Sequence, residues 1–306
     1  MRKTTRGIAL LFTLLLWPAV TSAQGSAALD PIRAAVDEGQ AEEAVRALVA
    51  LHKAGDASAE SHHLLGLAYQ IRLDEVGFLS KRRIAGKLRA TLERALELDP
   101  EHVGAHEELA DFYFFAPGIV GGSRRRAEEQ IEKLAAISAY DGHRVRGRHA
   151  YSTEKYREAE SHFTKALELK NEDGWLWYQR ANARIQLREK DIQALADYER
   201  ALALGYDQPI VHYQVGRLCV RLGTCAERGE ESLRHFIANS EGRNLAFGRY
   251  RLAQLHEQAG RLREARAEAR KALAIEPKLD AAAALLVRVE EKMDLRSDRV
   301  RSAVSR

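Results

Sequence analysis

A short pattern that returns along the chain at a nearly constant interval limits what the chain can fold into. In each copy a charged or polar pair precedes Ala-Leu, and another aliphatic residue follows two places later. The alanines of successive copies lie 71, 35 and 71 residues apart, which is one or two periods of roughly 35 residues. A fixed period of this length predicts stacked helical repeats. The copies are ERALELDP at 93–100, TKALELKN at 164–171, ERALALGY at 199–206 and RKALAIEP at 270–277.

The composition agrees with a helical fold. The 306 residues include only 6 prolines and 7% aromatic residues, while alanine, leucine, glutamate and arginine are abundant. This mixture favours helix over sheet. The net charge is +4, but Arg2, Lys3 and Arg6 precede every acidic residue. Without these three cations, 45 basic residues stand against 44 acidic ones, so the charge gives no reason to expect a nucleic-acid partner.

Residues 1–23 have the pattern of a secretory signal peptide. The three cations precede an apolar run from Ile8 to Val20, and small residues follow up to an expected cleavage point after Ala23. The run is short and is broken by Pro18, so an uncleaved membrane anchor is the alternative and not the first expectation. No later stretch approaches the ~20 apolar residues of a membrane span. The sequence therefore predicts an exported protein, periplasmic or secreted, with no stable membrane span after cleavage.

The segment SHHLLGLAYQIRL (61–73) places Leu65, Gly66, Ala68 and Tyr69 on one stripe of a helix. Here the chain resembles the tetratricopeptide repeat (TPR) family, whose first helix carries Leu-Gly-x-x-Tyr and whose second helix carries spaced alanines that end near a proline. The resemblance implies an all-α, right-handed superhelical solenoid of stacked antiparallel helix pairs with a C-terminal capping helix. The last unit matches the family pattern best, at Leu252, Ala253, Gly260, Leu262, Ala265, Ala272 and Pro277.

The repeat pattern predicts one helical domain over residues 24–293, followed by a flexible tail at 294–306. Two inserts, at 74–83 and 116–123, lengthen the units in which they lie. A narrower resemblance, from Leu65 to about Leu233, is to exported bacterial TPR-containing proteins of unassigned function. The predicted units are a partial unit at 31–56, full units at about 58–101, 102–140, 141–173, 174–208, 209–241 and 245–278, and a cap at 279–293.

The resemblance also implies a binding surface, because the first helices of a TPR array line a concave groove in which peptides lie. The expected function is an exported protein-interaction scaffold that binds a peptide or partner protein there, with no cofactor and no catalysis. Arginine, tyrosine and glutamine suit an extended backbone or a carboxylate. The family's groove-facing positions correspond here to Arg144, Arg148, Tyr151, Gln179, Gln186, Tyr213, Arg217, Tyr250 and Gln254, and one unit earlier to Glu107, Asp111 and Phe114.

A glycine-rich segment at 118–126 is the alternative site. Ser123 is a good helix N-cap, and Arg124, Arg125 and Arg126 fall in the first helical turn, where an anion could bind. No G-x-x-x-x-G-K-[ST] pattern is present, and glycines also serve any irregular connection. An exported enzyme or anion-binding protein with its site at this segment is therefore the second functional hypothesis.

Cys219 and Cys225 stand near the end of one predicted helix and the start of its partner, across Gly223. In an exported protein two cysteines that meet would oxidise to a disulfide. The alternative is a small buried apolar residue at Cys219 and an incidental Cys225.

Other chemistry has weaker support. His102 and His106 lie four residues apart, as two ligands on one helix face would, but a third ligand is not evident, so no metal site is expected. No G-x-S-x-G motif or nucleophile–base pair is recognisable. A third hypothesis is a structural subunit of an envelope assembly, and thus a possible homo-oligomer, that buries the aromatic side chains at 112–115, Trp175 and Trp177.

Overall fold

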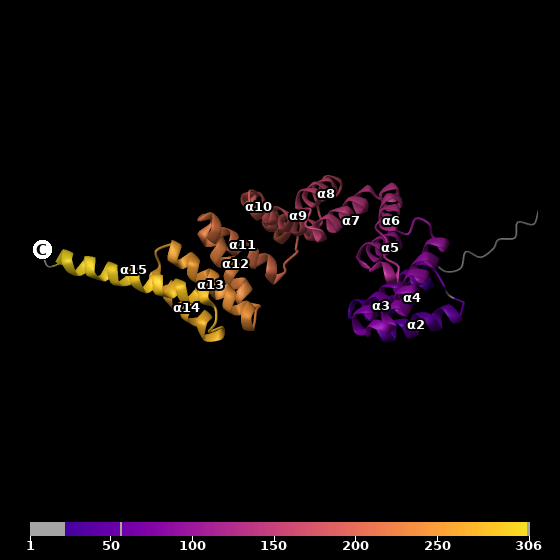
Figure 1. The fold of residues 1–306 in the computed structure, drawn as a ribbon, viewed down its shortest axis with the longest axis horizontal. Coiled ribbons are helices and arrows are strands. Elements are labelled where there is room, and N and C mark those ends of the chain that lie inside the picture. The colour runs from indigo at the N-terminus through magenta and orange to yellow at the C-terminus, as the bar shows by residue number, and fades with distance from the viewer. Residues whose placement is uncertain (1–21, 56, 305–306) are drawn as a thin grey trace, which may run out of the picture. The chain divides into compact units, whose positions relative to one another are not determined.

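The computed structural model describes residues 22–55 and 57–304 of the chain (Figure 1). Over these residues the chain forms fifteen α-helices and one 3₁₀ turn, and no strand. The predicted all-α class is confirmed. The signal-peptide prediction falls largely on residues 1–21, which lie outside the described residues. The expected cleavage point at Ala23 lies within α1 (Ser22–Asp37).

The chain divides into two compact units, Met1–Ser123 and Arg124–Arg306. The first unit contains α1 (Ser22–Asp37), α2 (Ala41–Lys53), α3 (Ala59–Glu75), α4 (Phe78–Leu98), α5 (Val103–Phe115) and η1 (Gly118–Val120). The second unit contains α6 (Arg124–Ile137), α7 (Ala139–Ser152), α8 (Tyr156–Leu169), α9 (Gly174–Gln186), α10 (Asp191–Ala203), α11 (Pro209–Leu222), α12 (Ala226–Ala238), α13 (Gly242–Gln258), α14 (Leu262–Ile275) and α15 (Asp280–Val304).

Consecutive helices pack as hairpins, and the second helix of each hairpin packs on the first helix of the next. In the second unit the hairpins are α7–α8, α9–α10, α11–α12 and α13–α14, and α15 packs on α13 and α14. The stacked-repeat fold is confirmed, while the predicted unit boundaries stay a prediction. The predicted unit 102–140 is divided, because α5 belongs to the first compact unit and α6 to the second.

The recurring alanines explain why the hairpins form. Ala95, Ala166, Ala201 and Ala272 are all fully buried. A residue of this size lets two helix backbones approach closely, and larger side chains of the facing helix fill the remaining space. No hairpin can bury both of its apolar sides alone, so each depends on its neighbours in the stack.

Both inserts become ordered structure. The insert at 74–83 mostly extends α4, which begins at Phe78 after an extended Gly77. The insert at 116–123 forms a turn around η1, which packs on α4.

The predicted flexible tail also differs from the structure, because α15 runs to Val304. The segment from 294 onward contains neither proline nor glycine, so nothing in its sequence stops the helix that precedes it. Among the described helices, none is long and apolar enough to cross a membrane.

Gly66 shows the close approach most clearly. A Cβ atom placed on Gly66 in α3 would lie 2.5 Å from Cδ2 and 2.8 Å from Cγ of the fully buried Leu92 in α4. We expect Gly66→Ala to destabilise the α3–α4 hairpin by about 1–3 kcal/mol, the usual cost of overpacking a filled core. Faster hydrogen exchange of the α3 and α4 amides would report the loss.

The matched control is Gly86→Ala in α4, because Gly86 is exposed and its added Cβ would meet no atom within 4 Å. That change should slow exchange, since alanine favours helix over glycine by roughly 0.5–1 kcal/mol. Equal protection in both variants would contradict the packing argument.

The first unit also carries a pH-sensitive histidine. Burial, followed by the nearby His52 and Arg94, lowers the pKa of His62 from 6.5 to about 4. The folded protein therefore binds this proton less readily than the unfolded chain does. The stability that His62 contributes is complete above pH 6.5 and is lost as the pH falls from 6.5 through 4.

We expect the urea midpoint of the wild-type first unit to fall between pH 7 and pH 5 by more than that of His62→Gln. Circular dichroism at several pH values measures both midpoints, and an NMR titration of His62 should give a midpoint near 4. A His62 midpoint near 6.5 would contradict the assignment.

Candidate functional site

The first helices of successive hairpins in the second unit line a pocket of about 750 Å³. We call it the arginine–tyrosine pocket. It lies where the sequence predicted part of the groove, because three of the nine predicted groove residues, Tyr151, Gln186 and Arg217, line it. The full lining is Tyr151 from α7, Tyr178, Asn182, Ile185 and Gln186 from α9, Arg188 from the turn after α9, Asp191 at the start of α10, and Ile210, Gln214, Arg217 and Arg221 from α11.

One side of the pocket is set by tyrosines and amides. Tyr151 hydrogen-bonds to Gln186, and burial raises the pKa of the Tyr151 phenol above its usual value. The fully buried Tyr198 of α10 donates its hydroxyl proton to Asn182 Oδ1 at 2.6 Å. Asn182 Nδ2 in turn donates to Gln179 Oε1 at 3.3 Å, so Gln179 supports the pocket without lining it. These contacts fix which edge of each amide faces the cavity.

The other side carries the positive charge. Arg221 pairs with Asp191 and so is neutralised by its neighbour. Arg217 Nε and Gln214 Oε1 are both buried and have no hydrogen-bond partner within residues 22–55 and 57–304. Burial lowers the pKa of Arg217 from its usual value, and the nearby charge of Arg221 acts in the same direction. An acceptor for Arg217 and a donor for Gln214 would satisfy this side of the pocket.

Three further predicted residues form a network beside it. Arg251 of α13 donates to Gln254 Oε1 at 2.8 Å and to the Tyr213 hydroxyl at 3.5 Å. Gln254 Nε2 donates to the Tyr250 hydroxyl at 2.9 Å, and the Arg251 guanidinium lies 5.2 Å from the centre of the Tyr250 ring. Arg251 therefore joins Tyr213, Tyr250 and Gln254, although the sequence argument did not single it out.

Two predicted groove arginines lie elsewhere on α7. Arg144 Nη2 pairs with Asp141 of its own helix at 2.9 Å, and both side chains are only 18% exposed. Arg148 is half-buried on the same helix and does not line the pocket. Glu107, Asp111 and Phe114 belong to α5 in the first compact unit.

The residues that were missed share a helix face with those that were predicted. Asn182 lies four residues before Gln186, and Gln214 and Arg221 flank Arg217 at three and four residues. Residues at this spacing are neighbours on a helix surface, so the helical period could have identified them.

A buried ionic network holds α9 in place beneath the pocket. Asp197 of α10 is 2% exposed and accepts from Arg180 Nη2 at 2.8 Å and from Arg184 Nη1 at 2.8 Å. Arg184 also reaches Glu160 of α8 at 2.9 Å, and Lys190 reaches the same carboxylate at 2.6 Å. The network ties α9 to the helices before and after it, so the α9 side chains of the pocket stand on a fixed support.

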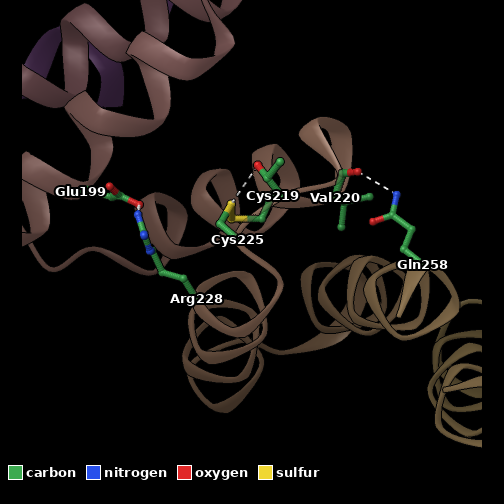
Figure 2. Close-up of a disulfide and its surroundings, with 7 residues drawn as sticks. Glu199, Cys219, Val220, Cys225, Arg228 and Gln258 are labelled. Atoms are coloured by element: carbon green, nitrogen blue, oxygen red, sulfur yellow. Dashed lines mark hydrogen bonds and ion pairs between the residues drawn. A yellow bond between two sulfur atoms is a disulfide. The ribbon is translucent and has the colours of Figure 1, made fainter. Parts of the chain in front are cut away.

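The two cysteines are joined in a disulfide, with Cα atoms 5.4 Å apart (Figure 2). Cys219 is fully buried near the end of α11, and Cys225 is the N-cap of α12 with a left-handed backbone. Gly223 between them is also left-handed, at φ +66°, which lets the chain reverse within six residues. Figure 2 also shows Gln258 of α13 donating to the Val220 carbonyl at 2.8 Å. The α11–α12 turn is therefore fastened on both sides.

The glycine-rich segment has a structural explanation. A Cβ at Gly122 would lie 1.7 Å from the Ala116 carbonyl oxygen, and Gly121 has φ +110°. Ser123 N donates to the Tyr113 carbonyl at 2.7 Å, which closes the turn. Arg125 pairs with Glu129 of its own helix, and Ser123, Arg124 and Arg126 also have interaction partners. The anion-binding hypothesis for this segment stays a prediction.

His102 and His106 do not present a shared helix face. His102 precedes α5 as its N-cap, and its Nδ1 accepts from Ala105 N at 3.2 Å. His106 is buried, and its Nε2 bonds to the Pro100 carbonyl at 2.9 Å.

The aromatic side chains of the structural-subunit hypothesis differ in exposure. Phe112 is buried, Phe115 is 54% exposed, and Trp177 packs under Arg180 and donates its Nε1 proton to the Asn171 carbonyl.

Comparison with known proteins identifies the repeat. Residues 248–279 match the family model of the tetratricopeptide repeat; they cover the C-terminal part of α13 and all of α14. A comparison with curated proteins finds no significant match.

Solved structures show the same fold. PilF of Pseudomonas aeruginosa has a TM-score of 0.55 at 19% identity, over 75% of this chain and 97% of that one. YrrB, described as a TPR protein with an unusual peptide-binding site, has a TM-score of 0.52 at 20% identity, over 63% and 95%. A chain of the APC/C hetero-tetramer Cut9–Hcn1 has a TM-score of 0.57 at 15% identity, over 87% and 51%, so this chain spans about half of its length. At these identities the likeness establishes the fold alone.

The ionic network beneath the pocket can be tested by removing its centre. We expect Asp197→Ala to destabilise the second unit by about 3–5 kcal/mol, because it leaves the buried Arg180 and the partly buried Arg184 without their shared carboxylate. Trp175 and Trp177 on α9 give a fluorescence signal for urea unfolding of this region.

Arg228→Ala is the control, since the Arg228 side chain is 55% exposed and pairs with Glu199 at the surface (Figure 2). It should cost less than about 1 kcal/mol. If both variants lost the same free energy of unfolding, the buried network would contribute no more to stability than a surface ion pair does.

Proposed function

We propose that this chain, which contains a tetratricopeptide repeat at residues 248–279 and stacks further helix pairs beside it, binds an extended peptide segment along α7, α9, α11 and α13. The fold is that of protein-interaction scaffolds in general. The arginine–tyrosine pocket is the position on this surface at which a side chain of the peptide would be recognised. The proposed ligand carries a carboxylate there, from an acidic side chain.

The observation that carries this proposal is the pair of buried, unsatisfied groups on α11. Arg217 Nε and Gln214 Oε1 have no hydrogen-bond partner within the part of the chain that the structure describes. A buried polar group without a partner costs about 1–3 kcal/mol. Neither atom is exposed to solvent in this conformation, so both side chains would turn toward the cavity on binding. A peptide carboxylate beside Arg217 and a peptide N–H beside Gln214 would then recover that cost with a charge-assisted bond and an ordinary one.

Rigidity supports the same conclusion. The ionic network around Asp197 fixes α9, and the disulfide fastens the turn between α11 and α12. A surface that is ordered before it binds loses little conformational entropy on binding. Less of the favourable free energy of binding a short segment is then offset by the entropy lost when the protein becomes ordered.

Export is part of the proposal and rests on the leader pattern at residues 1–23. The disulfide is consistent with it, because such bonds persist in oxidising compartments outside the cytosol. We propose no catalytic role for the pocket, since its side chains offer hydrogen bonds and charge and not a nucleophile with a base.

The test uses the full chain and two sets of immobilised, fluorescein-labelled nine-residue peptides that are identical except that a central Glu in one set is Gln in the other. We expect the wild-type protein to bind the Glu set with a lower Kd than the Gln set. Arg217→Glu should reduce binding of the Glu set at least about tenfold, because a charge-assisted hydrogen bond contributes about 1.5–3 kcal/mol.

The control is Arg200→Glu, which makes the same charge change at an exposed position on α10. Its binding should match that of the wild type. Equal binding of both peptide sets by the wild type, or equal losses in the two variants, would disprove the proposed pocket.

A further inference from the structure

Two groups of imidazole and carboxylate side chains come together in the described part of the chain. One group is Glu60, His63 and His102 in the first unit, and the other is Asp207, His212 and His235 in the second. In each group one ligand atom from every residue lies within 4.8 Å of the others, close enough to share a metal ion. The hydrogen bonds around each group decide whether its lone pairs are available.

In the first unit, His102 already caps the N-terminus of α5. His102 Nδ1 accepts from Ala105 N at 3.2 Å, so the neutral ring carries its proton on Nε2. That Nε2 donates to Glu60 Oε2 at 3.0 Å, and the other oxygen of Glu60 accepts from Arg33 at 2.5 Å. A metal ion on Nε2 would force the proton onto Nδ1, against the Ala105 N–H. This group therefore carries no metal proposal.

The group in the second unit has no such constraint. The His212 and His235 rings are stacked, with centres 3.9 Å apart and planes 19° apart. Stacked rings cannot both direct a nitrogen lone pair at one ion, so metal binding requires the His235 side chain, which is 40% exposed, to turn its ring out of the stack. His212 Nε2 lies 2.6 Å from Asp207 Oδ1, and His235 Nε2 lies 3.8 Å from the same oxygen. Nothing among the described residues hydrogen-bonds to His212 Nδ1, so the ring proton can move there and leave the Nε2 lone pair for a ligand bond.

The distances suit a tetrahedral ion. Zinc binds imidazole nitrogen and carboxylate oxygen at ~2.0–2.1 Å, which places neighbouring ligand atoms of a tetrahedral site roughly 3.3–3.4 Å apart. The two nitrogen–oxygen separations here, 2.6 and 3.8 Å, lie on either side of that value. Asp207 precedes α11, and its side chain is 59% exposed, so its carboxylate is free to move as the His235 ring turns and to bring both separations toward that value.

The two histidines stand on a stiff support. His212 is in the first turns of α11 and His235 is near the end of α12, so the antiparallel hairpin brings them side by side. A Cβ at Gly216 would lie 2.3 Å from Leu233 Cγ, which shows how closely the two helices pack. The disulfide between Cys219 and Cys225 closes the other end of the hairpin (Figure 2). Ligands on packed helices keep their spacing better than ligands on loops.

We propose that Asp207, His212 and His235 bind one zinc ion, with a fourth coordination position open to water or to a ligand from another molecule. A set of two imidazoles and one carboxylate binds zinc in preference to magnesium or calcium, which prefer oxygen ligands. The site belongs to the α11–α12 hairpin and does not depend on the peptide-binding proposal.

The experiment is an isothermal titration of the full chain with ZnCl2, using protein without a histidine tag, with the disulfide intact and without thiol reductant. We expect the wild type to bind one equivalent of zinc saturably, and the His212→Gln/His235→Gln double variant to show no such binding. Asp207→Asn should weaken binding at least about tenfold, since even indirect partners of a metal site contribute that much. Because Asp207 is exposed, this variant also keeps the test valid if the double variant folds poorly.

His63→Gln in the first unit is the matched control and should keep the equivalent. Substitution with Co²⁺ gives a second measurement, a visible absorption band that disappears in the double variant. Zinc binding that survives in both the double variant and Asp207→Asn, or that is lost in His63→Gln, would overturn the proposal. A wild-type titration without saturable heat would overturn it as well.

Discussion

The close contact between the two helices of each hairpin is the constraint on which the rest of the structure depends. It requires a small residue at one position and a large one directly opposite. Gly66 faces Leu92, Gly147 faces Phe163 and Gly216 faces Leu233, each too close to admit a Cβ atom without a shift. A hairpin packed this tightly has one arrangement, and the next hairpin stacks on the surface it presents. The position of every pocket residue follows from that stacking.

The sequence predicted this framework well, because its cause is local and periodic. The recurring Ala-Leu pattern marked the second helices, and Ala95, Ala166, Ala201 and Ala272 are all fully buried. The helices pack in adjacent pairs from α7 to α14, as the period of roughly 35 residues predicted. The exceptions lie where periodicity says nothing: the division of the chain after Ser123, and the continuation of α15 to Val304.

The candidate sites were predicted less completely, because they depend on contacts between residues far apart in sequence. Arg217 was identified, but the carboxylate that neutralises its neighbour Arg221 belongs to Asp191, thirty residues earlier. Asp197 lies on α10, and only the packed hairpin brings Arg180 and Arg184 of α9 to it. His212 and His235 are likewise 23 residues apart, on α11 and α12, and meet only when the hairpin closes. The spacing of residues along one helix cannot predict contacts with residues on another helix.

The order of the hairpins has a consequence for how the second unit would come apart. In a stack where each element contacts only its neighbours, opening begins at a free end and proceeds inward one element at a time. At the C-terminal end, α15 and then the α13–α14 hairpin would fray before α11 loses its support. The side chains that converge from α7, α9 and α11 therefore lie inward of the C-terminal helices, which can unfold and refold first while the pocket keeps its shape.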